Sequence, residues 1–180
     1  MPGNMKNLIA DTFISLSLNK NIDKITVKDL VEACNISRQT FYYHFQDILQ
    51  VIEWNVEQNV QKALTRSLQA ETLEEALEIF LELAISKHDI IRRLLQSQQR
   101  EHLEKLFTTA LEEYLSGVFR NKIGMKAIDA DDLRILRSFY TYGVVGVLLD
   151  SCRQENLDVR HLSSQLARLL SNTPFNIDKS

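Results

Sequence analysis

Hydrogen-bonding side chains are concentrated in one short stretch of the chain, from Ser37 to His44. The stretch reads Ser-Arg-Gln-Thr-Phe-Tyr-Tyr-His, and only its phenylalanine lacks a hydrogen-bonding group. Arginine pairs with guanine edges or phosphates, and glutamine pairs with adenine edges. Serine, threonine and tyrosine hydroxyls bind phosphate oxygens. Because the major groove of DNA admits one α-helix, an exposed helix with these side chains would suit the reading of base edges.

A second, amphipathic helix and a tight turn precede this stretch. The apolar face of that helix has the spacing i, i+3, i+4 and i+7, and consists of Val27, Leu30, Val31 and Cys34. Thr26 and Asp29 form a capping-box pattern at its start. Asn35 tolerates the positive φ that a three-residue turn between crossed helices needs. The pattern therefore predicts a helix-turn-helix.

The helix after the turn is expected to begin behind Ser37, a favourable N-cap residue. Phe41 and Phe45, four residues apart, would anchor it to a core and leave its other side chains pointing outward. An ordinary surface helix would explain any one of the polar residues alone. The whole pattern from Thr26 to Phe45 favours DNA recognition instead.

The segment from Asn7 to Trp54 resembles the N-terminal DNA-binding domain of the TetR family of transcriptional regulators. That family has a first helix, a Thr-capped second helix, a turn, and a recognition helix that ends in a run of aromatic residues closed by phenylalanine. The matching residues here are Ile9, Phe13 and Leu16, then Thr26 to Leu30, then Ile36 to Phe45. The rest of the chain is similar to the family in its length and its all-helical pattern.

The resemblance implies a homodimer that binds a near-palindromic operator in double-stranded DNA. The DNA-binding residues would be Thr26, Lys28, Ser37, Arg38, Gln39, Thr40, Tyr42, Tyr43 and His44. A small-molecule effector would act on the C-terminal domain and change the spacing of the two DNA-binding domains, here called the heads. The sequence does not identify the effector or its pocket. The alternatives are a TetR-like co-regulator whose body mainly binds a partner protein, and a structural helical protein with a vestigial head.

Two positions depart from the family pattern. Asn35 stands where the family usually has glycine, and Ile48 stands where it usually has a lysine that touches a phosphate. The loss of one such contact would weaken DNA binding and lower its salt slope by about one unit. The run from Phe45 to Ile48, with the Ile-Glu-Trp that ends at Trp54, also resembles a subgroup of TetR-like activators linked to dihydroxyacetone kinase operons.

Two C-terminal helices are expected to form a dimer interface. The stretch from Asp131 to about Arg153 is apolar nearly all round, so we expect it to be buried on two sides. Together with a last helix from about Val159 to Ser171, and doubled by a two-fold axis, it would make a four-helix interface. The predicted interface residues are Phe139, Tyr142, Gly143, Gly146, Leu149, Leu162, Leu166 and Leu169. A central core helix in a monomer is the alternative.

Composition favours an all-α protein. The chain has 180 residues, is 44% hydrophobic and 25% charged, and has only two prolines, both near its ends. We predict a helix-turn-helix domain over residues 1–47 and a helical ligand-binding and dimerisation domain over residues 48–180. The net charge of −3 is not that of a general nucleic-acid coat protein. Charges balance over residues 1–50, and residues 71–113 are acidic, which fits contact with DNA at one end only.

The sequence shows no pattern typical of an enzyme or a metal site. The histidines are scattered along the chain, at His44, His88, His102 and His161. There is no HExxH spacing, no Gly-rich phosphate loop and no nucleophile elbow. We therefore expect no catalysis, metal or cofactor, and interpret Cys34 and Cys152 as small buried hydrophobes. The sequence opens without a signal peptide pattern, and its longest apolar run is too short for a bilayer, so a cytoplasmic location is expected.

Overall fold

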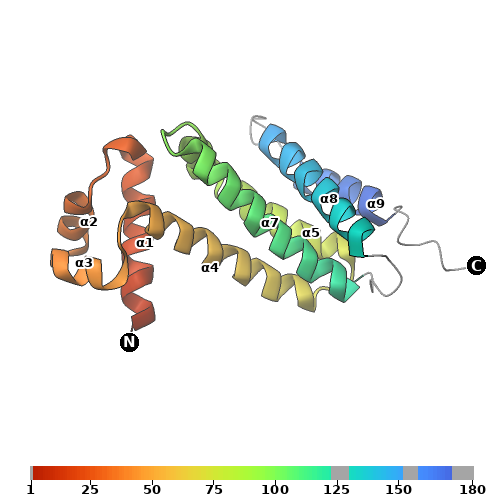
Figure 1. Cartoon of the computed structure of the whole chain (residues 1–180), viewed down its shortest axis with the longest axis horizontal. Coiled ribbons are helices and arrows are strands. Elements are labelled where there is room, and N and C mark those ends of the chain that lie inside the picture. The colour runs from red at the N-terminus through yellow and green to blue at the C-terminus, as the bar shows by residue number, and fades with distance from the viewer. Residues whose placement is uncertain (1, 123–129, 152–157, 172–180) are drawn as a thin grey trace, which may run out of the picture. The chain divides into compact units, whose positions relative to one another are not determined.

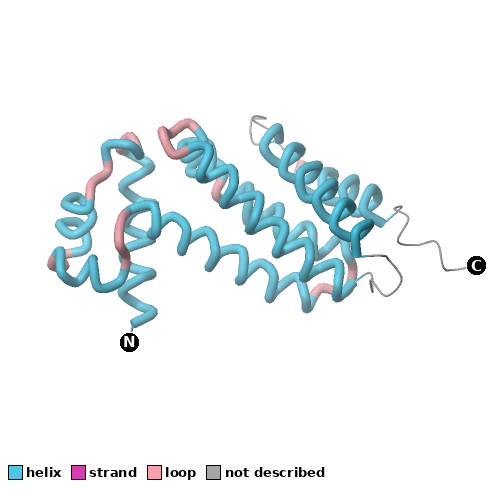
Figure 2. The backbone as a smooth tube through the Cα atoms, viewed as in Figure 1, coloured by secondary structure: helices cyan, strands magenta, loops and turns pink. Residues whose placement is uncertain are grey.

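A computed structural model of the chain describes residues 2–122, 130–151 and 158–171. Within these residues the chain forms helices joined by loops and turns, and no strand (Figures 1 and 2). The helices are α1 (Pro2–Asn19), the short 3-10 helix η1 (Ile22–Lys24), α2 (Val27–Cys34), α3 (Arg38–His44), α4 (Ile48–Gln69), α5 (Leu73–Ser86), α6 (His88–Leu95), α7 (Arg100–Lys122), α8 (Ala130–Ser151) and α9 (Val159–Ser171). The predicted all-α fold is confirmed.

Contacts between residues divide the chain into two compact units. The N-terminal unit comprises Met1–Gln58 and Asp89–Leu106, and the C-terminal unit comprises Asn59–His88 and Phe107–Ser180. The N-terminal unit therefore extends past residue 47, where the sequence analysis placed the domain boundary. The reason is that the first half of α4 and the segment 89–106 pack with the first three helices.

Polar contacts between residues distant in sequence hold the segment 89–106 to the rest of the N-terminal unit. The Arg93 guanidinium donates to the backbone oxygen of Ser17 at 3.2 Å. The backbone N–H of Gln98 donates to Asp23 Oδ1 at 3.0 Å. His102 Nε2 lies 2.7 Å from Glu53 Oε1 on α4. These contacts supplement an apolar core whose members include Ile9, Phe13, Leu30, Phe41, Phe45, Val51, Ile52 and Leu94.

Local side-chain caps decide where α4 and α5 begin. Asp47 Oδ1 accepts the backbone N–H of Gln50 at 2.8 Å and so caps the start of α4. Thr72 and Glu75 form a capping box at the start of α5. The Glu75 N–H donates to Thr72 Oγ1 at 3.1 Å, and Glu75 Oε2 accepts the Thr72 N–H at 3.3 Å.

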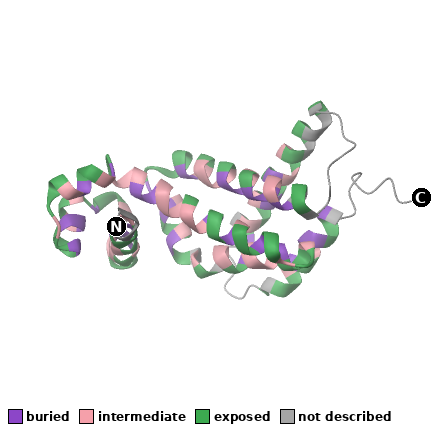
Figure 3. Cartoon of the chain, turned by 90° about the horizontal axis from the view of Figure 1, so that it is seen from below, coloured by how far each residue is buried: buried purple, intermediate pink, exposed green. Residues whose placement is uncertain are grey.

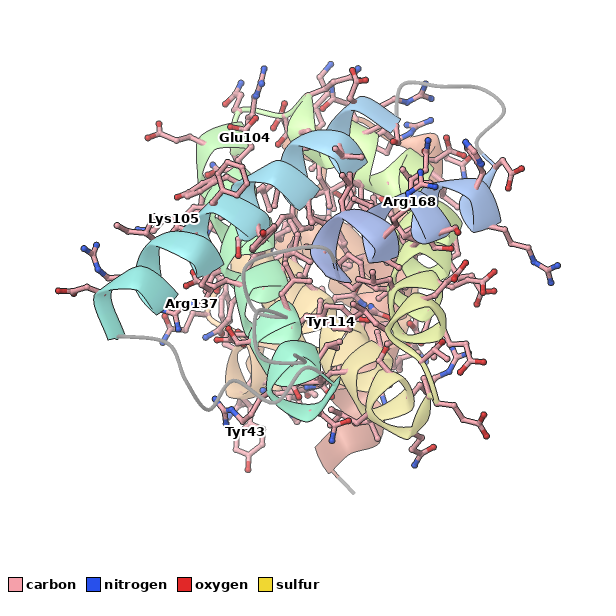
Figure 4. The ribbon with its side chains drawn as sticks, turned by 90° about the vertical axis from the view of Figure 1, so that its right-hand side faces the viewer. Tyr43, Glu104, Lys105, Tyr114, Arg137 and Arg168 are labelled. Atoms are coloured by element: carbon pink, nitrogen blue, oxygen red, sulfur yellow. The ribbon has the colours of Figure 1, made fainter. Side chains whose placement is uncertain are left out.

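The C-terminal unit has a buried tyrosine at its centre. Tyr114 of α7 is fully buried, and its ring packs against Phe80 with the ring centroids 4.5 Å apart. Its hydroxyl donates to the backbone oxygen of Ala76 on α5 and lies 2.9 Å from Ser67 Oγ on α4. Burial raises the pKa of Tyr114 to about 12. These hydroxyl contacts link α7 to α5 and α4. Figure 4 shows the Tyr114 side chain among the helices.

Ion pairs join α8 and α9 to the other helices of the C-terminal unit. Arg137 Nε of α8 lies 2.9 Å from Glu112 Oε1 of α7, and Arg160 Nε of α9 lies 3.5 Å from Glu78 Oε1 of α5. Helices α5 and α9 also pack directly against each other. Buried positions recur along the helices with exposed positions between them, as amphipathic helices require (Figure 3).

Candidate nucleic-acid interface

The capping box predicted at the start of α2 is present. The hydroxyl and the backbone N–H of Thr26 both donate to Asp29 Oδ2 at 2.7 Å, and the Asp29 N–H donates back to Thr26 Oγ1 at 3.2 Å. Lys20 Nζ lies 2.8 Å from the same carboxylate oxygen. Its hydrogen bond, together with those from Thr26, holds the pKa of Asp29 well below its ordinary value.

The turn between α2 and α3 has the backbone conformation that the sequence predicted. Asn35 has φ 53° and ψ 47°, in the left-handed region, and it is the one non-glycine residue with positive φ in the described part of the chain. The N–H of Ile36 donates to the oxygen of Val31 at 3.0 Å, which closes the end of α2. This turn fixes the direction in which α3 leaves.

Helix α3 is capped by a hydroxyl and anchored by phenylalanine. Ser37 Oγ accepts the Thr40 N–H at 3.0 Å and lies 2.8 Å from Thr40 Oγ1. Phe41 and Phe45 are almost wholly buried, and Phe45 meets the Trp54 ring edge-on with the centroids 6.0 Å apart. The predicted anchoring at i, i+4 is confirmed, so the remaining side chains of α3 face away from the core.

The outward side chains of α3 are polar or aromatic. Arg38 and Gln39 are exposed, and neither side chain has a hydrogen bond or ion pair within the described residues. Tyr42 is 57% exposed and Tyr43 is 82% exposed. Figure 4 shows Tyr43 pointing away from the ribbon. His44 is half-buried and meets the Tyr43 ring edge-on at 5.0 Å.

Two predicted contacts on α2 differ in their availability. Lys28 is exposed, and its ammonium lies 3.7 Å from Glu32 in a solvent-facing pair, which a phosphate could replace at little cost. The hydroxyl proton of Thr26 is already donated to Asp29. Thr26 thus serves as the cap of α2 and has no free donor for a phosphate.

The sequence analysis assigned no role to Lys6 and Lys20, which support the site. Lys6 Nζ lies 5.1 Å from the Phe45 ring centroid and 5.9 Å from that of Trp54, so it covers the aromatic residues that anchor α3. Lys20 orders the cap of α2 through Asp29. Neither lysine stands at a motif spacing, so no sequence signal could have identified these contacts.

Five of the eight residues predicted to form a dimer interface are exposed, four on α8 and one on α9. Phe139 is 70% exposed and Tyr142 is 66% exposed, and a Cβ added at Gly143 or Gly146 would meet nothing within 4 Å. On α9, Leu169 is 66% exposed. Leu162 is half-buried and Leu166 is buried within the subunit. The side chain of Leu149 lies outside the described residues.

Comparison with known protein families matches both parts of the chain. A family described as "Transcriptional regulator C-terminal region" matches residues 71–172, and "Bacterial regulatory proteins, tetR family" matches residues 16–53. The fold and these matches define a helix-turn-helix transcriptional regulator. Since the first match covers more than half of the chain, the protein belongs to the TetR family. Comparison with curated proteins gives no significant match.

Solved structures show the same fold over almost the whole chain. The dihydroxyacetone kinase operon activator DhaS is 18% identical with a TM-score of 0.74, over 92% of this chain and 93% of that one. A TetR transcriptional regulator from Streptococcus agalactiae is 24% identical with a TM-score of 0.68, over 94% of each chain. The TetR family repressor AlkX from Dietzia is 17% identical with a TM-score of 0.57, over 91% of this chain and 94% of that one. At these identities the similarity establishes the fold, and the activator subgroup stays a prediction.

Two further properties concern the described residues alone. None of their helices is both long and apolar enough to cross a membrane. They also contain no group of three or more histidine, cysteine, aspartate or glutamate side chains that could hold a metal ion. Cys34 is buried and free, and Cys152 lies outside the described residues.

Proposed function

We propose that the protein is a homodimer whose two α3 helices read a near-palindromic DNA operator. One observation carries this proposal: α3 buries its phenylalanine and presents its arginine, glutamine and two tyrosines to solvent. The exposed aromatic residues of this seven-residue helix are both tyrosines, so each carries a hydroxyl that can bind a phosphate. Its outward side chains carry the hydrogen-bonding groups that base edges and phosphates pair with.

The first turn of α3 is assigned to the bases. Arg38 and Gln39 have no side-chain partner within the described residues, so binding breaks no internal contact of theirs. The hydroxyls of Ser37 and Thr40 share one hydrogen bond, which leaves one hydroxyl proton for an external acceptor. Arginine suits a guanine edge and glutamine an adenine edge.

The second turn of α3 and the start of α2 are assigned to phosphates. Tyr42 and Tyr43 carry exposed hydroxyls, and His44 lies beside Tyr43. Lys28 adds a positive charge. Its surface ion pair with Glu32 is weak, so the ammonium group can move to a phosphate. Thr26 would reach a phosphate only if its hydroxyl turned away from Asp29, so its contribution is to fix α2.

The apolar face of α8 supports dimerisation. Ile135, Phe139, Tyr142 and Val147 are exposed large hydrophobic residues on one helix, and the exposed glycines Gly143 and Gly146 lie among them. A monomeric protein seldom leaves such a face open to water. A second copy of the chain would cover it, together with Leu169 of α9. Two heads would then contact half-sites about one helical turn, or a multiple of it, apart.

A small-molecule effector acting on the C-terminal unit completes the proposal. Thr141 of α8 is 1% exposed, and its hydroxyl has no hydrogen-bond partner among the described residues. Such a buried group is rare, because desolvating an unpaired hydroxyl is costly. A bound effector with a polar group would satisfy it and favour one spacing of the heads.

The test is binding of the purified protein to DNA from upstream of its own gene, measured by fluorescence anisotropy at two salt concentrations. We expect two subunits per operator and an affinity that falls steeply with salt. The matched control is an Arg38→Ala protein on the same DNA. Equal, salt-insensitive binding to any duplex would contradict the proposal. Binding that appears only with a co-purified protein would support the alternative, a co-regulator that acts through a partner.

A further inference from the structure

A groove of about 400 Å³ opens in the N-terminal unit beside the start of α4. Three stretches far apart in the sequence line it, at residues 22–27, 47–52 and 98–99. No residue of α3 lines it, so it is distinct from the helix assigned to the bases. Two of its lining residues, Val27 and Ile48, lie at or beside positions where phosphate contacts are expected. Its apolar lining consists of Ile22, Ile25, Val27, Ile48, Leu49 and Ile52.

The polar lining of the groove is acidic. It comprises the carboxylates of Asp23 and Asp47, with the amides of Gln98 and Gln99. Asp23 Oδ1 accepts the Gln98 N–H at 3.0 Å, and Asp47 Oδ1 accepts the Gln50 N–H at 2.8 Å. Each carboxylate therefore has its second oxygen free of any hydrogen bond or ion pair with a described residue. Among the described residues that line the groove, none is basic.

We propose that this groove binds a small amphipathic organic cation, with its apolar body on the isoleucines and its ammonium group between the two aspartates. The volume is within the range of small-molecule sites. An ammonium group would donate charge-assisted hydrogen bonds to the free carboxylate oxygens. A carboxylate ligand would meet like charge, and a neutral ligand would leave the charges of both aspartates unmatched.

Ile48 is the residue that gives the groove this selectivity. The family resemblance predicts a lysine at this position, and a lysine there would bring its own positive charge to the groove. Isoleucine instead adds apolar wall. Because Ile48 opens the helix that follows α3, a ligand in the groove would join the start of α4 to η1 and to residues 98–99. It would thereby favour the arrangement of the N-terminal unit in which these stretches are together.

The test uses the full-length protein with methyl-labelled isoleucine, titrated with phenethylammonium and followed by NMR. We expect saturable shifts at Ile22, Ile25, Ile48 and Ile52, and none at isoleucines outside the groove such as Ile9. Three probes serve as matched controls. They are 2-phenylethanol, which replaces the ammonium by a hydroxyl, 3-phenylpropanoate, which reverses the charge, and ethylammonium, which lacks the ring. Each should bind about tenfold more weakly or not at all.

Variants locate the ammonium. The double variant Asp23→Asn, Asp47→Asn keeps both side-chain acceptors and removes both charges. We therefore expect it to bind phenethylammonium at least about tenfold more weakly. Ile48→Lys should abolish it. Asp11→Asn, which removes an exposed carboxylate of α1 outside the groove, should leave it unchanged. The proposal is overturned if no saturable shift is seen, if 2-phenylethanol or 3-phenylpropanoate binds equally well, or if the double variant retains full affinity. The titration contains no DNA, so its failure would leave the proposed operator binding unaffected.

Discussion

Helices α3 and α8 both expose aromatic side chains, but the residues next to those side chains differ in chemistry. On α3, Tyr42 and Tyr43 stand beside arginine and glutamine, and the apolar anchors are buried. On α8, Phe139 and Tyr142 stand beside Ile135, Val147 and two exposed glycines. Exposed aromatics are therefore ambiguous on their own. Neighbouring hydrogen-bond donors favour a charged, hydrated partner such as DNA. Neighbouring aliphatic residues and glycines favour an interface with another protein from which water is excluded.

The largest effect is expected from a charge placed on the apolar face of α8. Phe139→Glu should weaken self-association by about 2 kcal/mol or more, because a carboxylate would be buried without a partner in the interface. Sedimentation equilibrium would measure the change in dimer dissociation constant. Leu68→Glu puts the same charge on an exposed apolar residue of α4 and should have little effect. Equal dissociation constants for the two variants would remove α8 from the interface.

The second largest effect is expected from replacing Arg38, and this loss of operator affinity should be confined to one base position. Arg38→Ala is expected to cost about 1–3 kcal/mol of operator affinity at the pair that Arg38 reads, and to relax specificity there. Competition anisotropy with single-substituted operators would measure it. Self-association should not change, because the side chain lies on α3. If every substituted operator lost affinity equally, Arg38 would be a phosphate contact.

The third effect should be smaller and independent of sequence. Tyr43→Phe removes one exposed hydroxyl and keeps the ring, so we expect a loss of about 1 kcal/mol or less on every operator alike. The same anisotropy series would show the same loss of affinity on each substituted operator. A loss restricted to one base pair would instead place Tyr43 in the base-reading set.

The smallest effect concerns the cap of α2 at low pH. Lys20 and Thr26 hold the pKa of Asp29 below its ordinary value, so this carboxylate stabilises the N-terminal unit above about pH 4. The stabilisation is lost as the pH falls through the lowered pKa. Asp29→Asn should flatten that part of the stability profile, as followed by Trp54 fluorescence during urea unfolding. An unchanged acid limb would mean that the Lys20 pair contributes nothing in solution.

Features that depend on neighbours in sequence were predictable. The capping box of Thr26 and Asp29, the left-handed Asn35 and the phenylalanine anchors of α3 are each set within a few residues, so their pattern is visible in the sequence. The caps of α4 and α5 were predictable for the same reason. The fold and the outward face of α3 follow from them.

Features that depend on contacts across long stretches of chain were not predictable. The hydrogen bonds from Arg93 to Ser17 and from Gln98 to Asp23 bring residues 89–106 into the N-terminal unit, and no periodicity marks them. The contact of Tyr114 with Ser67 and Ala76 is of the same kind. An inward stripe shows that a residue is buried, and does not show which residues surround it.

The most direct measurement is selection of bound sequences from a random DNA library by the wild-type protein. Two copies of α3 joined through α8 should enrich a near-palindrome, with half-sites about one helical turn or a multiple apart. Enrichment of a single asymmetric half-site would contradict the dimeric arrangement. Recovery of no common sequence would contradict base reading by Arg38, Gln39 and Thr40.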